Sequence, residues 1–499
     1  MLCFQGLEAR SWAFRVHCLL GVSLSLATRL SPKTPKVYRP RRPWESALFK
    51  VFSDHFPAFV EEYPERHQKA WGYQRPVIER SVGRFLRCGL LEHGFGRFQC
   101  RVCKDELLLA FSCRQRGLCT SCGAKRSAAW GRWVREELVR PVGHRHLVFT
   151  IPKRLRPFFK FNRTLLREMS GWAYELIRAL LASQVPLRAG EEPGSARPGC
   201  VSVLELSGNL LNLQPHLHLI VSDGAFSKSG ERFYPADPAL WKLLEEAFRH
   251  KVLEEMKKRE HISSAVQKNL LSWKHSGFSV FVGAPIQPDE PERLERLARY
   301  VRRTHLSESR VRYDEERDQV IYSSGKQPHP TFKANFRIFD ARDFVAAVCG
   351  FLPDSKRHES LAYGEYANVV RGKRAKADPP CSEGPPLSEE RPLPLRLKAA
   401  WREMLRHIYE VDPLLCPCGG KLKRISLILD PAVIQKFLRH LGRWPPPRRP
   451  PKGPRAPPPP PPRRAEPQEP PLSEAEGSQL PLWEDKDEIW SQLPPSEEG

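Results

Sequence analysis

Two histidines separated by one leucine, His216 and His218, begin the aliphatic run Leu219-Ile-Val221. Aliphatic and β-branched runs favour strands, and residues two apart on a strand point to the same face. The sequence therefore predicts a strand over residues 217–222 with two imidazoles side by side, which is half of a divalent-metal site. Two ordinary core or surface histidines are the alternative, and the rest of the chain must decide between them.

A third metal ligand is available in the preceding predicted strand, over residues 200–206, where Glu205 stands among aliphatic residues. If the two strands pair, its carboxylate lies near the histidines. Two histidines and a carboxylate leave positions open for phosphate oxygens around a hard ion such as Mg or Mn. A surface carboxylate near the end of a strand is the alternative for Glu205.

Closely spaced cysteines predict a second kind of metal site. Cys100-Arg-Val-Cys103 and Cys119-Thr-Ser-Cys122 are separated by fifteen residues. Each pair can form a knuckle with two thiolates, and two knuckles complete a tetrahedral zinc shell. Cys88 and Cys113 are extra ligands or buried thiols. Cys416-Pro-Cys418 forms only half of a zinc site, and a compact glycine turn is the favoured interpretation there.

The net charge is +24, which favours a polyanionic partner such as nucleic acid. The sequence contains no apolar run of about 18 residues, so no transmembrane helix is expected. Paired cysteines in a basic chain are typical of metal binding in a reducing cytoplasm rather than of disulfides. Phe149, Trp172 and Phe226 are candidates for stacking on bases, with core positions as the alternative.

A nucleophile candidate lies in a predicted helix that contains Leu294, Leu297 and Val301, spaced as a core stripe. Tyr300 stands at the edge of this stripe, where its hydroxyl can reach a neighbouring site. A phenol has a pKa near 10, so acting as a nucleophile requires a basic, metal-containing environment. A core-edge aromatic residue is the alternative interpretation.

The chain divides by composition into several segments. Residues 38–86 have helical spacing, a helix is expected over 163–183, and residues 238–310 are mostly helical around a strand at 278–282. A strand pair is expected at 319–323 and 332–338, and a helix at 341–349. The predicted domains are an unpatterned extension (1–37), a helical and zinc-binding domain (38–140), a catalytic domain (141–371), a linker (372–392), a small cysteine-containing module (393–443) and a disordered proline-rich, acidic tail (444–499).

From about Tyr38 to Gly442, the motifs resemble the HUH rolling-circle transposases of the IS91 type, including those of insertion sequence common regions. The segments that carry the resemblance are Tyr38-Arg-Pro-Arg-Arg-Pro43, Phe111-Ser-Cys-Arg-Gln-Arg-Gly-Leu-Cys-Thr-Ser-Cys122, His146-Leu-Val-Phe-Thr-Ile-Pro-Lys-Arg-Leu-Arg156, Pro215-His-Leu-His-Leu-Ile-Val-Ser-Asp-Gly224, Tyr363-Gly-Glu-Tyr-Ala-Asn-Val-Val-Arg-Gly-Lys-Arg374 and Asp412-Pro-Leu-Leu-Cys-Pro-Cys-Gly-Gly420.

The resemblance implies an α+β fold, in which an N-terminal zinc ribbon precedes a relaxase-like domain with an antiparallel sheet flanked by helices. It also implies that Tyr300 cleaves single-stranded DNA at the ends of a mobile element. Cleavage would leave a 5′-phosphotyrosine and a free 3′-hydroxyl, and rejoining would need no nucleotide cofactor. Structural zinc and catalytic Mg or Mn are the implied metals. The implied location is the cytoplasm, with the protein on the nucleoid when bound to DNA.

The chain departs from the family's Tyr-x-x-x-Tyr motif, because Arg296 stands at the first tyrosine position. Arg296 lies one turn before Tyr300, so we expect it to share a helix face with Tyr300 and grip a phosphate. The alternative function is a non-catalytic zinc-ribbon DNA-binding protein from a degenerate transposase.

Overall fold

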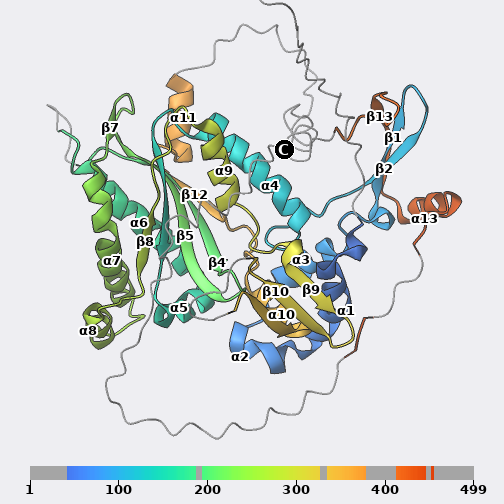
Figure 1. The fold of residues 1–499 in the computed structure, drawn as a ribbon, viewed down its shortest axis with the longest axis horizontal. Coiled ribbons are helices and arrows are strands. Elements are labelled where there is room, and N and C mark those ends of the chain that lie inside the picture. Colours follow the sequence, from blue (N-terminus) through green and yellow to red (C-terminus); the bar gives the residue numbers. More distant parts are fainter. Residues whose placement is uncertain (1–41, 187–193, 326–333, 378–411, 446–450, 454–499) are drawn as a thin grey trace, which may run out of the picture. The chain divides into compact units, whose positions relative to one another are not determined.

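The computed structural model describes residues 42–186, 194–325, 334–377, 412–445 and 451–453. The predicted extension, most of the linker and most of the proline-rich tail therefore lie outside the described residues. The described part mixes helices with antiparallel sheets (Figure 1), which confirms the predicted α+β class. None of the described helices is long and apolar enough to cross a membrane.

A five-stranded sheet forms the centre of the region that contains the two histidines. Every neighbouring pair of strands in it is antiparallel, and β5, which carries both histidines, is the middle strand. The three strands predicted here, over 200–206, 217–222 and 278–282, are confirmed with shifted ends. In sheet order the strands are β12 (Ser360–Gly364), β4 (Gly199–Ser207), β5 (Leu213–Ser222), β3 (His144–Thr150) and β8 (Ser279–Val282).

One face of this sheet is apolar and covered by helices. Leu217, Leu219 and Val221 alternate along β5 and are fully buried against α6 and α7. Burying such side chains contributes roughly 1.5–3 kcal/mol each, so these residues fix which face of β5 turns away from the helices. The helices on this side are α5 (Arg156–Phe161), α6 (Thr164–Ala182), α7 (Leu244–Lys258) and α8 (Ser264–Ser272).

The opposite face carries the histidines and is packed by α9 (Pro291–Val301), with α4 (Thr120–Trp133) and the π-helical η4 (Val134–Leu138) behind it. Leu294, Leu297 and Val301 are buried in this core, which confirms the predicted stripe. Gly131 lets α4 and α9 approach closely, because a Cβ atom there would lie 2.5 Å from the Cγ atom of Arg299.

The N-terminal helices share a separate core with a second sheet. Phe52 of α1 and Phe344 of α10 belong to this core, although they are far apart in sequence. The predicted helical character of 38–86 is confirmed for the described residues, and the strand at 319–323 is found as predicted. The elements are α1 (Ala47–Glu62), η2 (Tyr63–His67), α2 (Gln68–Trp71), α3 (Pro76–Phe85), β9 (Val311–Asp314), β10 (Gln319–Ser323), β11 (Phe336–Asp340) and α10 (Ala341–Gly350).

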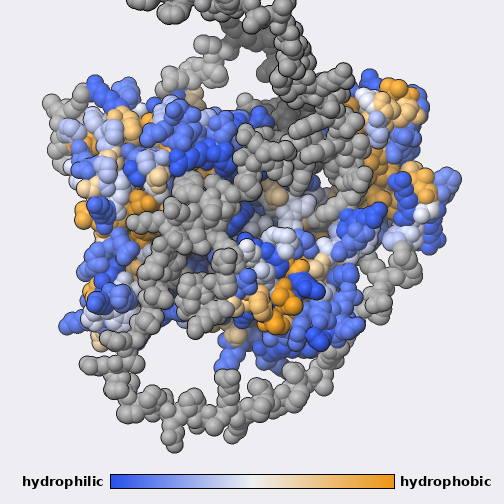
Figure 2. Space-filling view, in the orientation of Figure 1, coloured by the Kyte–Doolittle hydropathy of each residue, from blue (hydrophilic) through white to orange (hydrophobic). Residues whose placement is uncertain are grey.

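A three-stranded sheet joins two strands that follow the N-terminal helices to one strand near the C-terminal end of the described chain. Its order is β13-β1-β2, and both pairs are antiparallel. Hydrophobic residues gather at the surface of this part (Figure 2, right). Ile425 and Leu427 of β13, and Leu429 just after its end, are exposed. The elements are η3 (Leu91–His93), β1 (Phe95–Cys100), β2 (Glu106–Ala110), β13 (Leu422–Ile428) and α13 (Pro431–His440).

Short elements complete the described chain. The helix α11 extends six residues into the segment predicted to be a linker from residue 372. These elements are η1 (Pro43–Glu45), η5 (Lys153–Leu155), β6 (Gly224–Phe226), β7 (Phe233–Pro235), η6 (Pro238–Leu243), η7 (Glu308–Arg310) and α11 (Asn368–Ala377).

Candidate functional site

His216 and His218 lie on the face of β5 opposite to its leucines, as the alternation of the sequence predicts. His218 is buried, and His216 is partly exposed. Burial lowers the pKa of His216 to about 4 and lowers that of His218 well below its usual value of 6.5. Both imidazoles are therefore neutral at neutral pH, the form that binds metal ions.

A backbone carbonyl fixes the tautomer of His216. Its Nδ1 atom lies 2.6 Å from the carbonyl oxygen of Gln214. A carbonyl only accepts hydrogen bonds, so Nδ1 carries the proton and Nε2 keeps a lone pair. Metal-binding histidines are commonly oriented in this way by a bond from the other ring nitrogen.

His146 of β3 is a third histidine of this face, with a role that the sequence alone does not predict. Its Nε2 atom lies 3.0 Å from the Nδ1 atom of His218, and the two rings are stacked with centroids 5.2 Å apart. Burial lowers the pKa of His146 to about 3, so one neutral ring donates to the other. The signal in the sequence is that His146 directly precedes the apolar residues of β3. This strand pairs with β5, which carries the other two histidines.

Glu205 lies directly opposite His216 in the pairing of β4 with β5. Residues directly opposite each other in an antiparallel pair share a face and have neighbouring side chains. Burial, reinforced by the nearby carboxylate of Glu359, raises the pKa of Glu205 to about 8, whereas Arg302 and Arg303 lower it. The expected pairing of the two strands is therefore present.

Tyr300 reaches the histidines from α9. Its ring lies edge-on to both, with centroids 5.9 Å from that of His218 and 6.3 Å from that of His146. The guanidinium carbon of Arg303 lies 4.5 Å from the centroid of the tyrosine ring. Burial raises the pKa of the Tyr300 hydroxyl, and the positive charge of Arg303 opposes this rise. The packing stripe of α9 thus places a phenol beside the imidazoles.

Arg296 lies one helical turn before Tyr300 on α9, and its side chain is exposed. The neighbouring Glu295 is buried instead, and its carboxylate lies 2.6 Å from Arg135. The side chain of Arg296 is thus accessible to an approaching ligand, whereas that of Glu295 is buried in an ion pair with Arg135.

The first cysteine cluster consists of Cys88, Cys113, Cys119 and Cys122, whose sulfur atoms all lie within 4.8 Å of one another. The distances are 3.7 Å from Cys88 to Cys119, 3.8 Å from Cys88 to Cys122 and 3.7 Å from Cys113 to Cys122. A tetrahedron with Zn–S bonds of 2.3 Å has edges of about 3.8 Å. The four sulfurs therefore fit one zinc ion, with Cys119 and Cys122 at the N-terminus of α4.

The predicted shell of Cys100, Cys103, Cys119 and Cys122 is corrected by this arrangement. The strands β1 and β2 carry Cys100 and Cys103 away from the start of α4, where Cys119 and Cys122 lie. Cys100 and Cys103 instead form a second cluster with Cys416 and Cys418. The Cys-x-x-Cys spacing predicts that each cysteine pair supplies two ligands of a metal site, but it does not predict which pairs come together.

The histidine site differs from the cysteine clusters in how its ligands are arranged. Across the described residues, three or more potential ligand atoms lie within 4.8 Å of one another only at the cysteines. His216, His218 and Glu205 therefore share a face without forming a closed shell. The imidazole nitrogens and the carboxylate of Glu205 nevertheless form a set of donors that suits Mn. The carboxylate is also a suitable ligand for Mg.

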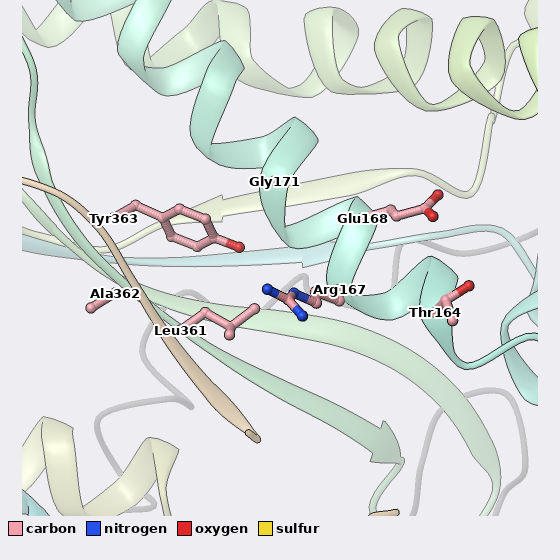
Figure 3. Close-up of a pocket in the computed structure, with 7 residues that line it drawn as sticks. All are labelled: Thr164, Arg167, Glu168, Gly171, Leu361, Ala362 and Tyr363. Atoms are coloured by element: carbon pink, nitrogen blue, oxygen red, sulfur yellow. The ribbon is translucent and has the colours of Figure 1, made fainter. Parts of the chain in front are cut away.

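The aromatic residues considered for base stacking belong to the core, since Phe149, Trp172 and Phe226 are at most 4% exposed. A hollow between α6 and β12 is lined by Arg167, Glu168 and Tyr363 among others (Figure 3). Tyr363 lies opposite Cys200 in the strand pairing, and Cys200 belongs to the apolar core of α6 and α7. The hollow is therefore not part of the histidine site.

Two family models match the chain: the transposase zinc-binding domain over residues 51–151 and a putative transposase over residues 199–374. The transposase for insertion sequence element IS801 of Pseudomonas savastanoi pv. phaseolicola is 30% identical over 161 residues, which are 32% of this chain and 36% of that relative. A putative transposase of Sinorhizobium fredii is 25% identical over 276 residues, 52% of this chain and 66% of that relative. The chain thus spans less than two thirds of either relative.

No solved structure matches the chain significantly. The first model covers the first cysteine cluster together with Cys100 and Cys103, and the second covers both histidines of β5, Glu205 and Tyr300. With its zinc-binding domain ahead of the histidine sheet, the chain belongs to the IS91-type transposases.

Proposed function

We propose that the protein cuts and rejoins single strands of DNA at the ends of an insertion sequence, through a covalent bond to Tyr300. The observation that carries this proposal is the position of Tyr300, whose ring lies beside those of His218 and His146. A nucleophile beside ligands for a divalent ion is the arrangement that phosphoryl transfer requires.

In the proposed reaction, the hydroxyl oxygen of Tyr300 attacks a phosphorus atom of the DNA backbone. An O–P bond forms to the tyrosine, and the bond from phosphorus to the 3′ oxygen breaks. The tyrosine hydroxyl loses its proton, and the leaving 3′ oxygen gains one to become a hydroxyl. Since one phosphoester replaces another, a 3′-hydroxyl can reverse the step and rejoin the strand without a nucleotide cofactor.

His216, His218 and Glu205 would hold a Mg or Mn ion. When bound, such an ion withdraws charge from the phosphate oxygens and favours attack on phosphorus. The protein's own contribution is to present neutral imidazoles with fixed tautomers. Gln214 fixes His216, and His146 acts as the positioning residue for His218.

Arginines around Tyr300 would orient the negatively charged strand. Arg303 lies over the tyrosine ring, and Arg296 is exposed one turn earlier on the same helix. Arginine forms strong, charge-assisted hydrogen bonds with phosphate. A single tyrosine with Arg296 at the other motif position limits each chain to one covalent link at a time.

The zinc-binding domain would position the element end in this proposal. The chain carries a net charge of +24, and contacts between basic side chains and phosphates supply most non-specific affinity for DNA. A zinc ion held by the first cysteine cluster would fix the turn that bears Arg114 and Arg116. Binding should therefore weaken as the salt concentration rises.

The test is incubation of the purified protein with Mn or Mg and a labelled single-stranded oligonucleotide from the element end. We expect a covalent protein–DNA band on a denaturing gel that disappears in Tyr300→Phe, which removes only the hydroxyl. Tyr313→Phe, whose hydroxyl lies 2.8 Å from His55 in another core, is the matched control and should keep the band.

The alternative is a DNA-binding protein without catalysis. It predicts tight, salt-dependent binding to the same oligonucleotide but no covalent band with either metal. A band that persists in Tyr300→Phe would also contradict the proposal, because another nucleophile would then carry the bond.

A further inference from the structure

The C-terminal cysteines, Cys416 and Cys418, precede β13, which pairs with the hairpin of β1 and β2. We call this hairpin the N-terminal sheet. The strand β13 pairs along the whole length of β1, from Phe95 opposite Ile428 to Cys100 opposite Leu422. Behind this sheet, Leu438 of α13 is buried in a small core with Phe95. The turn that contains Cys416 and Cys418 is thereby brought to the end of β1, where Cys100 and Cys103 lie.

The sulfur atoms of this second cluster have the spacing of a metal shell. Cys100 lies 3.5 Å from Cys418, and Cys103 lies 3.5 Å from Cys416. All four sulfurs are within 4.8 Å of one another, close to the edges of about 3.8 Å expected around zinc. A disulfide would instead bring two sulfurs to about 2.05 Å.

The backbone on both sides is shaped around these sulfurs. The amide of Val102 donates to the Sγ atom of Cys100 at a distance of 3.4 Å. On the other side, Gly419 has a φ of +83°, and a Cβ atom at Gly420 would lie 2.5 Å from the Sγ atom of Cys100. The turn Cys416–Gly420 therefore requires its glycines in order to approach the cluster.

We propose that one zinc ion bound by Cys100, Cys103, Cys416 and Cys418 fastens the C-terminal segment to the N-terminal sheet. Zinc is favoured because four thiolates in a closed tetrahedral set are typical of structural zinc sites. This site is separate from the first cluster, so the chain binds two zinc ions in structural sites. The proposal is independent of the strand-transfer reaction, because none of its ligands comes from the sheet that carries the histidines.

Zinc content of the full-length protein gives the first test. We expect two zinc ions per wild-type chain and one in the double variant Cys416→Ser, Cys418→Ser. The double variant Cys88→Ser, Cys113→Ser should lose the other ion and keep this one. Cys349→Ala, a buried cysteine of α10 outside both clusters, is the matched control and should keep two.

Thiol reactivity of the wild-type protein gives a second test that does not depend on how the variants fold. Cys103 and Cys418 are both exposed, so without a metal ion they should react readily with N-ethylmaleimide. We expect both to be protected in the native protein and to become reactive together when a zinc chelator is added, as measured by mass spectrometry of the peptides.

Several outcomes would overturn this proposal. They are a single zinc ion in the wild-type chain, iron in place of zinc, or equal reactivity of Cys103 with and without the chelator. Failure of the strand-transfer reaction would leave these measurements unaffected, so the two proposals can fail separately.

Discussion

The Nε2 atom of His146 lies 3.0 Å from the Nδ1 atom of His218, which links neighbouring strands on the face that carries the proposed metal ligands. If His218 donates this hydrogen bond, its Nε2 atom keeps the lone pair that a metal ion requires. His146 then does for His218 what the carbonyl of Gln214 does for His216. In that arrangement, two different acceptors give the two ligands the same tautomer.

Replacing His146 with Ala should weaken metal binding without removing a ligand. Loss of such an outer partner typically lowers metal affinity roughly 10- to 100-fold. We expect the Mn concentration for half-maximal nicking to rise by that factor, with nicking restored at high Mn. His144→Ala is the matched control, since His144 is buried on the same strand but bonds to Tyr366. It should lower stability and leave the Mn dependence unchanged.

Replacing Arg296 with Ala should slow cleavage while the fold is retained, because its side chain is exposed. A hydrogen bond to a charged group contributes roughly 1.5–3 kcal/mol, so we expect the single-turnover nicking rate to fall about 10- to 100-fold. Arg293→Ala is the control, because Arg293 already pairs with Glu290 at 2.9 Å. Equal rates for the wild type and Arg296→Ala would contradict the proposed grip on phosphate.

Acid should destabilise the protein through its buried histidines. Burial lowers the pKa of His55 from 6.5 to about 4, so the unfolded chain binds this proton more readily than the folded chain does. The contribution of His55 to stability is therefore complete above pH 6.5 and is lost as the pH falls towards 4.

We expect His55→Gln to reduce the difference in the free energy of unfolding between neutral pH and about pH 5. Urea unfolding at both pH values, with zinc content checked, measures this difference. The exposed His275 provides a control, and His275→Gln should leave the pH dependence as in the wild type. An unchanged pH dependence in His55→Gln would show that the folded protein accommodates the charge on His55.

Replacing Gly420 with Ala should displace the zinc ion of the second cluster, because the new methyl group would overlap the Sγ atom of Cys100. We expect zinc content to fall from two ions to one per chain. In Gly83→Ala, the added methyl group meets no atom within 4 Å, and helical alanine is favoured over glycine by roughly 0.5–1 kcal/mol. That control should keep both ions and be slightly more stable.

The sequence predicted most local structure and the histidine face, because strand alternation and helix stripes follow directly from residue type. The alternation of Leu217 and Leu219 with His216 and His218 is sufficient to decide which side of β5 faces the helices. The stripe of α9 likewise placed Tyr300 at the edge of a core, as the structure has it.

What the sequence did not predict depends on contacts between distant segments. Cys103 meets Cys416 across 313 residues, and no local pattern encodes that pairing. His146 was missed for the same reason, since its partner lies on another strand 72 residues later. The strand β9, which completes the sheet of β10 and β11, was missed because it is short and only partly buried.

The pairing of β1 with β13 also bears on how the protein is made. A ribosome adds roughly 5–20 residues per second. Cys416 is 313 positions after Cys103, so synthesis of this stretch takes on the order of tens of seconds. Throughout that time one edge of β1 has no neighbour, and unpaired strand edges invite association with other chains. We therefore expect the nascent chain to be prone to association during translation, and a chain that ends before Asp412 to keep that edge of β1 open.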